Sequence, residues 1–155
     1  MYARQYDRAV EQGRKTYDLE PNHPSGSFWL FEAYDAKGMY NEATALFEKG
    51  FEADPDNPRY LYSMGYTEAK AGRKREAEER INKLRSISKE TYVLPYRVAR
   101  IYAALDQQDE AFAMLEKAYE ERDYYLPRLK VDPAFDNLRT DPRFSDLLRR
   151  MGLPQ

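Results

Sequence analysis

The side-chain types that most often carry out chemistry in proteins are scarce in this sequence. Among its 155 residues there is one histidine and no cysteine, so disulfides, thiolate nucleophiles and metal sites built from Cys or His clusters are excluded. The histidine, His23, lies between Asn22 and Pro24 with no acidic residue beside it, and we interpret it as a solvent-facing turn residue. The seven glycines do not cluster, so no phosphate-binding loop is predicted.

The charged residues form no pattern that indicates a catalytic or nucleic-acid site. Acidic pairs such as Glu78-Glu79 lie in charged stretches, where a solvated helix face is expected. The densest basic run, Arg73-Lys74-Arg75, is followed at once by Glu76, and the chain holds 25 Lys plus Arg against 27 Asp plus Glu. We therefore predict a protein that is not an enzyme, with no cofactor or metal ion, and that does not bind nucleic acid directly.

A 34-residue period organises most of the chain. Four alanines are spaced by this period, and the residues four positions after them form a second column: Ala9, Ala43, Ala77 and Ala111, then Gly13, Phe47, Ile81 and Leu115. Small residues in one column beside mostly large ones in the next suit two helices that cross closely and pack ridge into groove. A period of this length indicates stacked helical repeats.

Each unit divides into two amphipathic helical patterns. In the second unit the first pattern runs from Phe28 to Tyr34 and stops at Gly38, a residue type favoured just past a helix end. The second pattern, from Tyr40 to Phe51, has the 3.6-residue spacing of a helix with one apolar face. Asn57 and Pro58 then predict the start of the next helix, with Asn as its cap and Pro at its first position.

These positions resemble the tetratricopeptide repeat, a helix–turn–helix unit of 34 residues. The second unit carries the resemblance best, through Leu30, Tyr34, Gly38, Ala43, Phe47 and Pro55. The resemblance implies an all-α fold, a right-handed superhelical solenoid of antiparallel helix pairs in a single domain. It comprises a leading half repeat that is only a second helix, three full repeats and a C-terminal helical cap, at residues 1–21, 24–57, 58–91, 92–125 and 126–155.

The tail contains two Asp-Pro pairs, Asp132-Pro133 and Asp141-Pro142. Each pair predicts a short helix with Asp as its cap and Pro at its first position. The segment from Leu129 to Phe144 resembles the one that closes tetratricopeptide arrays in large bacterial proteins, where the array is often fused to a winged-helix regulator, a Ser/Thr kinase or a cyclase. Because a solenoid needs its last open face covered, we interpret this segment as the cap.

The resemblance also implies a concave groove lined by the first helix of each unit. Carried onto this chain, the groove positions are Phe28, Glu32, Arg59, Tyr62, Ser63, Tyr66, Lys70, Tyr96, Arg97 and Arg100. Tyr and Arg are enriched at binding hot spots, so the predicted groove is aromatic and net basic. The asparagines with which some members clamp a C-terminal carboxylate are missing here, although Arg97 and Arg100 offer bidentate bonds to a carboxylate or phosphate.

Two functions remain open at this point. The first is a non-catalytic protein–protein interaction scaffold that binds a peptide or a partner domain in its concave groove. The second is a structural or regulatory segment of a larger bacterial protein, such as a transcription regulator, a Ser/Thr kinase or a cyclase, that packs intramolecularly.

The beginning of the chain and its lack of apolar runs add two further expectations. The chain opens inside a repeat, so Tyr6, Val10 and Tyr17 are expected to form an uncovered apolar face through which a homo-oligomer forms. Neither a signal peptide nor an apolar run long enough to cross a membrane is visible, so no membrane contact is expected. The cytoplasm is the default location for such a chain without cysteine.

Overall fold

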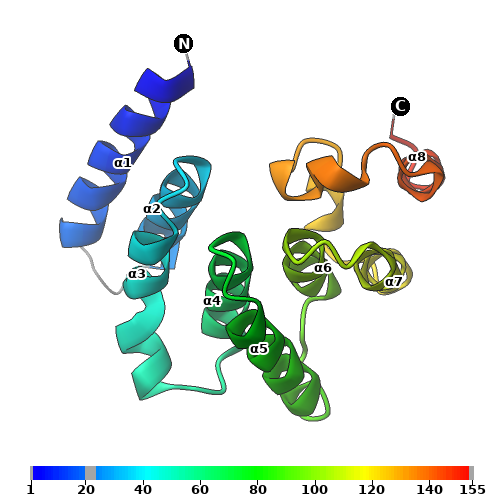
Figure 1. The fold of residues 1–155 in the computed structure, drawn as a ribbon, viewed down its shortest axis with the longest axis horizontal. Coiled ribbons are helices and arrows are strands. Elements are labelled where there is room, and N and C mark those ends of the chain that lie inside the picture. Colours follow the sequence, from blue (N-terminus) through cyan, green and yellow to red (C-terminus); the bar gives the residue numbers. More distant parts are fainter. Residues whose placement is uncertain (1, 20–23, 154–155) are drawn as a thin grey trace.

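The computed structural model describes residues 2–19 and 24–153, and within these ranges the fold is all-helical, as the repeat period predicts (Figure 1). The helices in chain order are α1 (Tyr2–Leu19), α2 (Pro24–Ala36), α3 (Tyr40–Ala53), α4 (Pro58–Lys70), α5 (Lys74–Ile87), α6 (Pro95–Ala104), α7 (Gln108–Glu120), the 3₁₀ turns η1 (Leu126–Arg128) and η2 (Pro133–Leu138), and α8 (Pro142–Arg150). The helices α1 to α7 pack mainly on their neighbours in the chain, which is the arrangement of a helical solenoid. His23 lies outside the described residues.

The turn between the two helices of each repeat has the same geometry three times. Its central residue has left-handed backbone angles in all three repeats: Gly38 (φ +70°), Gly72 (φ +78°) and Asp106 (φ +60°). In each case the following N–H donates to a carbonyl five residues earlier, at 2.8–2.9 Å, which closes the preceding helix. The sequence predicts the two glycines, whereas Asp106 occupies the third turn without being a glycine.

The starts of α4 and α6 follow from their prolines. Asn57 caps α4 as predicted, because its side-chain oxygen accepts the Arg59 N–H at 3.1 Å and Pro58 takes the first helical position. One period after Pro58 falls at residue 92, but α6 begins at Pro95. The residue before a proline is held in an extended conformation, and Leu94 shows this with φ −65° and ψ 111°.

The alanine column lies where the helices cross. Ala43, Ala77 and Ala111 are completely buried, in agreement with the close approach that the sequence predicts. Ala9 is exposed instead, because α1 packs on α2 through other positions. One of these is Gly13, where an added Cβ would lie 3.2 Å from the Leu30 Cα.

The apolar face of α1 is mostly covered, which corrects the expectation of an open face formed by Tyr6, Val10 and Tyr17. Val10 is only 8% exposed and Tyr17 is half-buried against the core, because α2 packs on this side of α1. Tyr6 stays exposed among mainly polar neighbours. None of the described helices combines the length and the apolar character that crossing a bilayer requires.

The tail folds into the two Asp-capped helices that the sequence predicts. The carboxylates of Asp132 and Asp141 accept backbone N–H groups of η2 and α8, respectively. Phe135 and Leu147 are completely buried, and η2 packs against α6. The tail therefore covers part of the last repeat.

Candidate functional site

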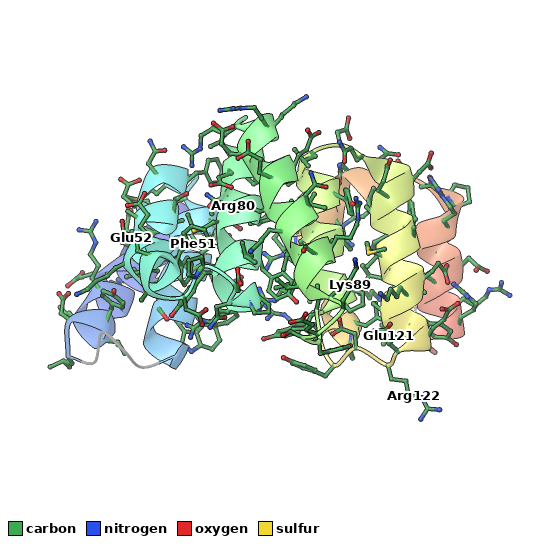
Figure 2. The ribbon with its side chains drawn as sticks, turned by 90° about the horizontal axis from the view of Figure 1, so that it is seen from below. Phe51, Glu52, Arg80, Lys89, Glu121 and Arg122 are labelled. Atoms are coloured by element: carbon green, nitrogen blue, oxygen red, sulfur yellow. The ribbon has the colours of Figure 1, made fainter. Side chains whose placement is uncertain are left out.

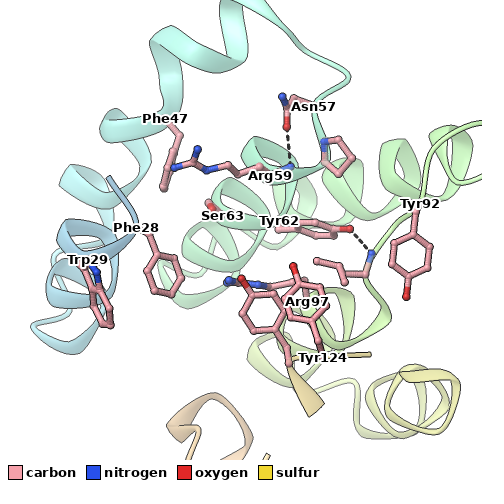
Figure 3. A pocket seen from close by; sticks show the side chains of 13 residues that line it. Phe28, Trp29, Phe47, Asn57, Arg59, Tyr62, Ser63, Tyr92, Arg97 and Tyr124 are labelled. Carbon is pink, nitrogen blue, oxygen red and sulfur yellow. Dashed lines mark hydrogen bonds between the residues drawn. The ribbon is translucent and has the colours of Figure 1, made fainter. Parts of the chain in front are cut away.

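A pocket of about 600 Å³ opens among the first helices of the three repeats and the loops beside α6 and α7 (Figure 3). More than half of its lining side chains are aromatic, two are arginines and none is acidic. The lining residues are Phe28, Trp29, Phe47, Asn57, Pro58, Arg59, Tyr62, Ser63, Tyr92, Leu94, Arg97, Tyr124 and Tyr125. Pockets with this mixture of apolar wall and few polar groups are the usual binding sites of proteins.

Exposed aromatic side chains mark the rim of this pocket. Trp29 is 65% exposed, Tyr92 59% and Tyr124 70%. They make up half of the large apolar side chains that are exposed in the described part of the chain. The ring of Trp29 meets that of Phe28 edge to face at 5.4 Å, and the rings of Tyr124 and Tyr125 lie 4.4 Å apart. A cluster of exposed apolar side chains is a mark of an interaction surface.

Arg97 lies among these rings. Its guanidinium carbon is 4.3 Å from the ring centre of Tyr125 and 5.5 Å from that of Phe28, so both rings attract the cation. Figure 3 shows Arg97 beside Phe28. Burial opposes ionisation of Tyr125, but the hydrogen bond and the charge of Arg97 outweigh it and lower the pKa of this phenol. Among the described side chains, no carboxylate lies within ion-pair distance of Arg97.

The wall contributed by α4 is held by polar contacts to its neighbours. The guanidinium of Arg59 donates to the Ser27 hydroxyl of α2. The Tyr62 hydroxyl accepts the N–H of Leu94, one of the N–H groups at the start of α6 that have no acceptor within the helix. Burial raises the pKa of Tyr62, so its hydroxyl stays protonated. These bonds fix the relative positions of α2, α4 and α6 around the pocket.

A second polar cluster lies deeper, around Arg100. This side chain is 5% exposed, with Nη1 3.5 Å from Glu32 Oε1 and Nε 3.5 Å from Asp132 Oδ2. Its guanidinium carbon lies 4.4 Å from the ring centre of Tyr66. Burial disfavours the charge of Arg100, but Asp132 and Glu32 outweigh it and hold its pKa above the ordinary value.

The cluster and the pocket are in contact through two tyrosines. The Tyr96 hydroxyl donates to Asp132 at 2.8 Å, and its ring stacks on that of Tyr125 at 6.1 Å. Tyr125 in turn faces Arg97. Arg100 is therefore linked to Tyr125 in the pocket wall through Asp132 and Tyr96.

The ten predicted groove residues divide between these two places. Five of them line the pocket: Phe28, Arg59, Tyr62, Ser63 and Arg97. Four others form the buried cluster instead: Glu32, Tyr66, Tyr96 and Arg100. Lys70 is exposed at the end of α4, with its ammonium 5.9 Å from the ring centre of Tyr40.

Several lining residues are not among the predicted groove positions. Trp29 directly follows the predicted position Phe28, and only the structure shows that its side chain is exposed. Tyr92, Tyr124 and Tyr125 lie in loops, to which a helix-based pattern does not extend. The adjacent pair Tyr124-Tyr125, at the end of the repeat 92–125, is the one sequence signal for two of these three residues.

The described residues contain no group of three or more His, Cys, Asp or Glu side chains that is placed to hold a metal ion. Asp123, which precedes Tyr124 in the chain, is 4% exposed and accepts the backbone N–H groups of Tyr96 and Tyr125. The pocket therefore presents a concave aromatic surface with two arginine side chains, Arg59 and Arg97.

The stacked helix pairs, their common turn and the pocket along their first helices define a helical-repeat solenoid. Two family models match the chain, both described as tetratricopeptide repeat, one over residues 1–65 and the other over residues 96–123. Together they span more than half of the sequence, and the chain belongs to the tetratricopeptide-repeat family. Searches of curated proteins and of solved structures gave no match. Repeats of this family generally mediate protein–protein contacts and are typically non-catalytic.

Proposed function

We propose that this chain is a non-catalytic scaffold that binds a peptide or a partner domain in the pocket along its first helices. The observation that carries the proposal is the gathering of Trp29, Tyr92 and Tyr124, all more than half exposed, around one pocket. Exposing such side chains to water is unfavourable, and a partner that covers them gains the hydrophobic free energy of that burial. Aromatic residues are also enriched at the energetic centres of protein interfaces.

The test is affinity capture of partners with the wild type and a Trp29→Ala, Tyr124→Ala double variant. Both side chains point away from the core, so the variant keeps its helices, which circular dichroism verifies. A matched control, Leu19→Ala with Val131→Ala, removes two exposed apolar side chains that do not line the pocket. We expect a partner to bind the wild type and the control but not the double variant. Equal capture by all three would place binding on another surface.

The alternative is a structural or regulatory segment that packs on another part of a larger protein. The same pocket would then be covered intramolecularly. Capture of no partner by any of the three proteins favours this alternative, because the surface would be made for a domain of the same polypeptide.

Self-association through α1 is a separate proposal. It rests on Tyr6, which is 38% exposed, now that Val10 is covered by α2. Sedimentation at several concentrations tests it, and a single monomeric species throughout would refute it.

A further inference from the structure

We propose that the pocket takes an extended peptide segment in which an internal Asp or Glu side chain pairs with Arg97 while neighbouring apolar side chains contact Trp29 and Tyr124. This inference rests on the proposed function and adds the chemistry of the partner. It is argued from the charge of the pocket, from the state of Arg97 and from the shape of the rim.

The charge of the pocket is opposite to that of the chain. The chain has a formal net charge of −2 with 27 acidic residues, yet none of the residues lining the pocket is acidic and two are arginines. A surface of one sign attracts and orients a partner of the other sign. A basic segment would find no carboxylate in this lining with which to pair.

Arg97 is placed to accept a carboxylate. The rings of Phe28 and Tyr125 face its guanidinium, and no carboxylate of the described residues pairs with it. Asp123 accepts two backbone N–H groups, and Glu32 pairs with Arg100 instead. A guanidinium in this state gains a charge-assisted, bidentate hydrogen bond when a carboxylate arrives.

The rim favours an extended segment over a small enclosed ligand. Small ligands are buried over most of their surface, whereas Trp29, Tyr92 and Tyr124 stand open to solvent at the edge of the pocket (Figure 3). A chain that passes across these rings places apolar side chains on them before and after the acidic residue. Nucleic acid is disfavoured because a phosphate backbone would need many cationic contacts.

The experiment is a selection from a library of random short peptides displayed on phage, carried out on four proteins. These are the wild type, Arg97→Glu, the control Lys89→Glu and the double variant Trp29→Ala, Tyr124→Ala. Lys89 is exposed and lies outside the pocket lining, and its reversal changes the net charge by the same amount as that of Arg97 (Figure 2). Circular dichroism verifies that all four remain folded.

We expect the wild type and Lys89→Glu to enrich peptides with an Asp or Glu between aromatic or aliphatic residues. Arg97→Glu should lose this acidic residue from its enriched peptides, and the double variant should enrich none. If Arg97→Glu and the wild type enrich the same peptides without an acidic preference, the inference about acidity is wrong while the proposed binding function stands. If the wild type enriches nothing, both fail.

A second measurement separates a side-chain carboxylate from a terminal one. Trp29 is the single tryptophan of the chain and lies on the pocket rim, so its fluorescence reports occupancy directly. An enriched peptide is synthesised with an amidated C-terminus, and again with Gln in place of its acidic residue. We expect amidation to leave the dissociation constant unchanged and the Gln peptide to bind at least about tenfold more weakly. The reverse result would overturn the assignment to an internal side chain.

Discussion

Arg100→Met should strongly destabilise the fold. Arg100 is 5% exposed and stands between Glu32 and Asp132, 3.5 Å from each. Methionine keeps an unbranched stem against the ring of Tyr66 but removes the positive charge. Two carboxylates then remain in a largely buried site without a counter-charge, and breaking a buried pair in this way costs about 3–5 kcal/mol.

The same reasoning predicts that a second substitution recovers part of this loss. Glu32 Oε1 is buried and has no hydrogen-bond partner among the described residues, so its charge is stabilised by Arg100 rather than by a bonding network. Glu32→Gln removes that charge. Residues that interact directly show coupling of about 0.5–3 kcal/mol, so Arg100→Met with Glu32→Gln should be less destabilised than the sum of the single variants. Asp132 is less suitable for this cycle because it also bonds Tyr96 and Ala134.

The assay is equilibrium unfolding in urea, followed by the helical circular dichroism signal. Arg75→Met serves as the control, because the Arg75 side chain is 81% exposed and its change should stay within about 0.5 kcal/mol. A loss below about 1 kcal/mol for Arg100→Met, or strict additivity in the double variant, would refute the view that the cluster is held by the charge of Arg100.

Three further predictions test the repeat register, the turn between the two helices of a repeat, and the carboxyl of Asp35, which is influenced by the charge of Arg100. Ala77→Leu places a large side chain where two helices cross and should cost about 1–3 kcal/mol, measured by thermal melting; an unchanged melting temperature would contradict the register. In Gly72→Ala the added methyl group meets no atom within 4 Å, but alanine must adopt a left-handed backbone at φ +78°, so the free energy of unfolding should fall by about 1–2 kcal/mol. The reverse change, Arg122→Gly, relieves a left-handed backbone at φ +55°. The Arg122 side chain points away from the body of the protein, so this variant should be as stable as the wild type or more stable (Figure 2). Burial raises the pKa of Asp35 while Arg100 opposes the shift, so the folded state holds the proton of this carboxyl more tightly than the unfolded chain does. The stability that Asp35 contributes is therefore lost as the pH rises from its unfolded pKa through the raised folded value. Over that range the melting temperature of Asp35→Asn should rise relative to that of the wild type. A constant difference in melting temperature between acidic and neutral pH would contradict this.

The repeated elements could be predicted from the sequence because their signals are local. Helix periodicity, the glycines of the turns and the Asn57 cap each depend on a few neighbouring residues. The burial of Ala43, Ala77 and Ala111 follows from the same period. These features place α2, α4 and α6 beside one another without any knowledge of the tail.

The depth of Arg100 and Tyr96 could not be predicted in this way. The period assigns them to the groove, but η2 packs against α6 and brings Asp132 onto both side chains. That contact depends on where a segment outside the period folds back. The aromatic rim has the same origin, since Tyr92 and Tyr124 lie in loops whose paths are set by the packing of the helices that they join.

The contacts of Arg100 also bear on how the protein responds to force. In an array whose repeats touch only their immediate neighbours, folding and unfolding can spread from one repeat to the next. Arg100, on α6, connects Asp132, the residue that caps η2 in the tail, to Glu32 on α2, two repeats before α6 in the chain. This connection joins segments that are not adjacent in the chain. Under tension the repeats that Arg100 joins are therefore expected to unfold together, which force spectroscopy would record as one event.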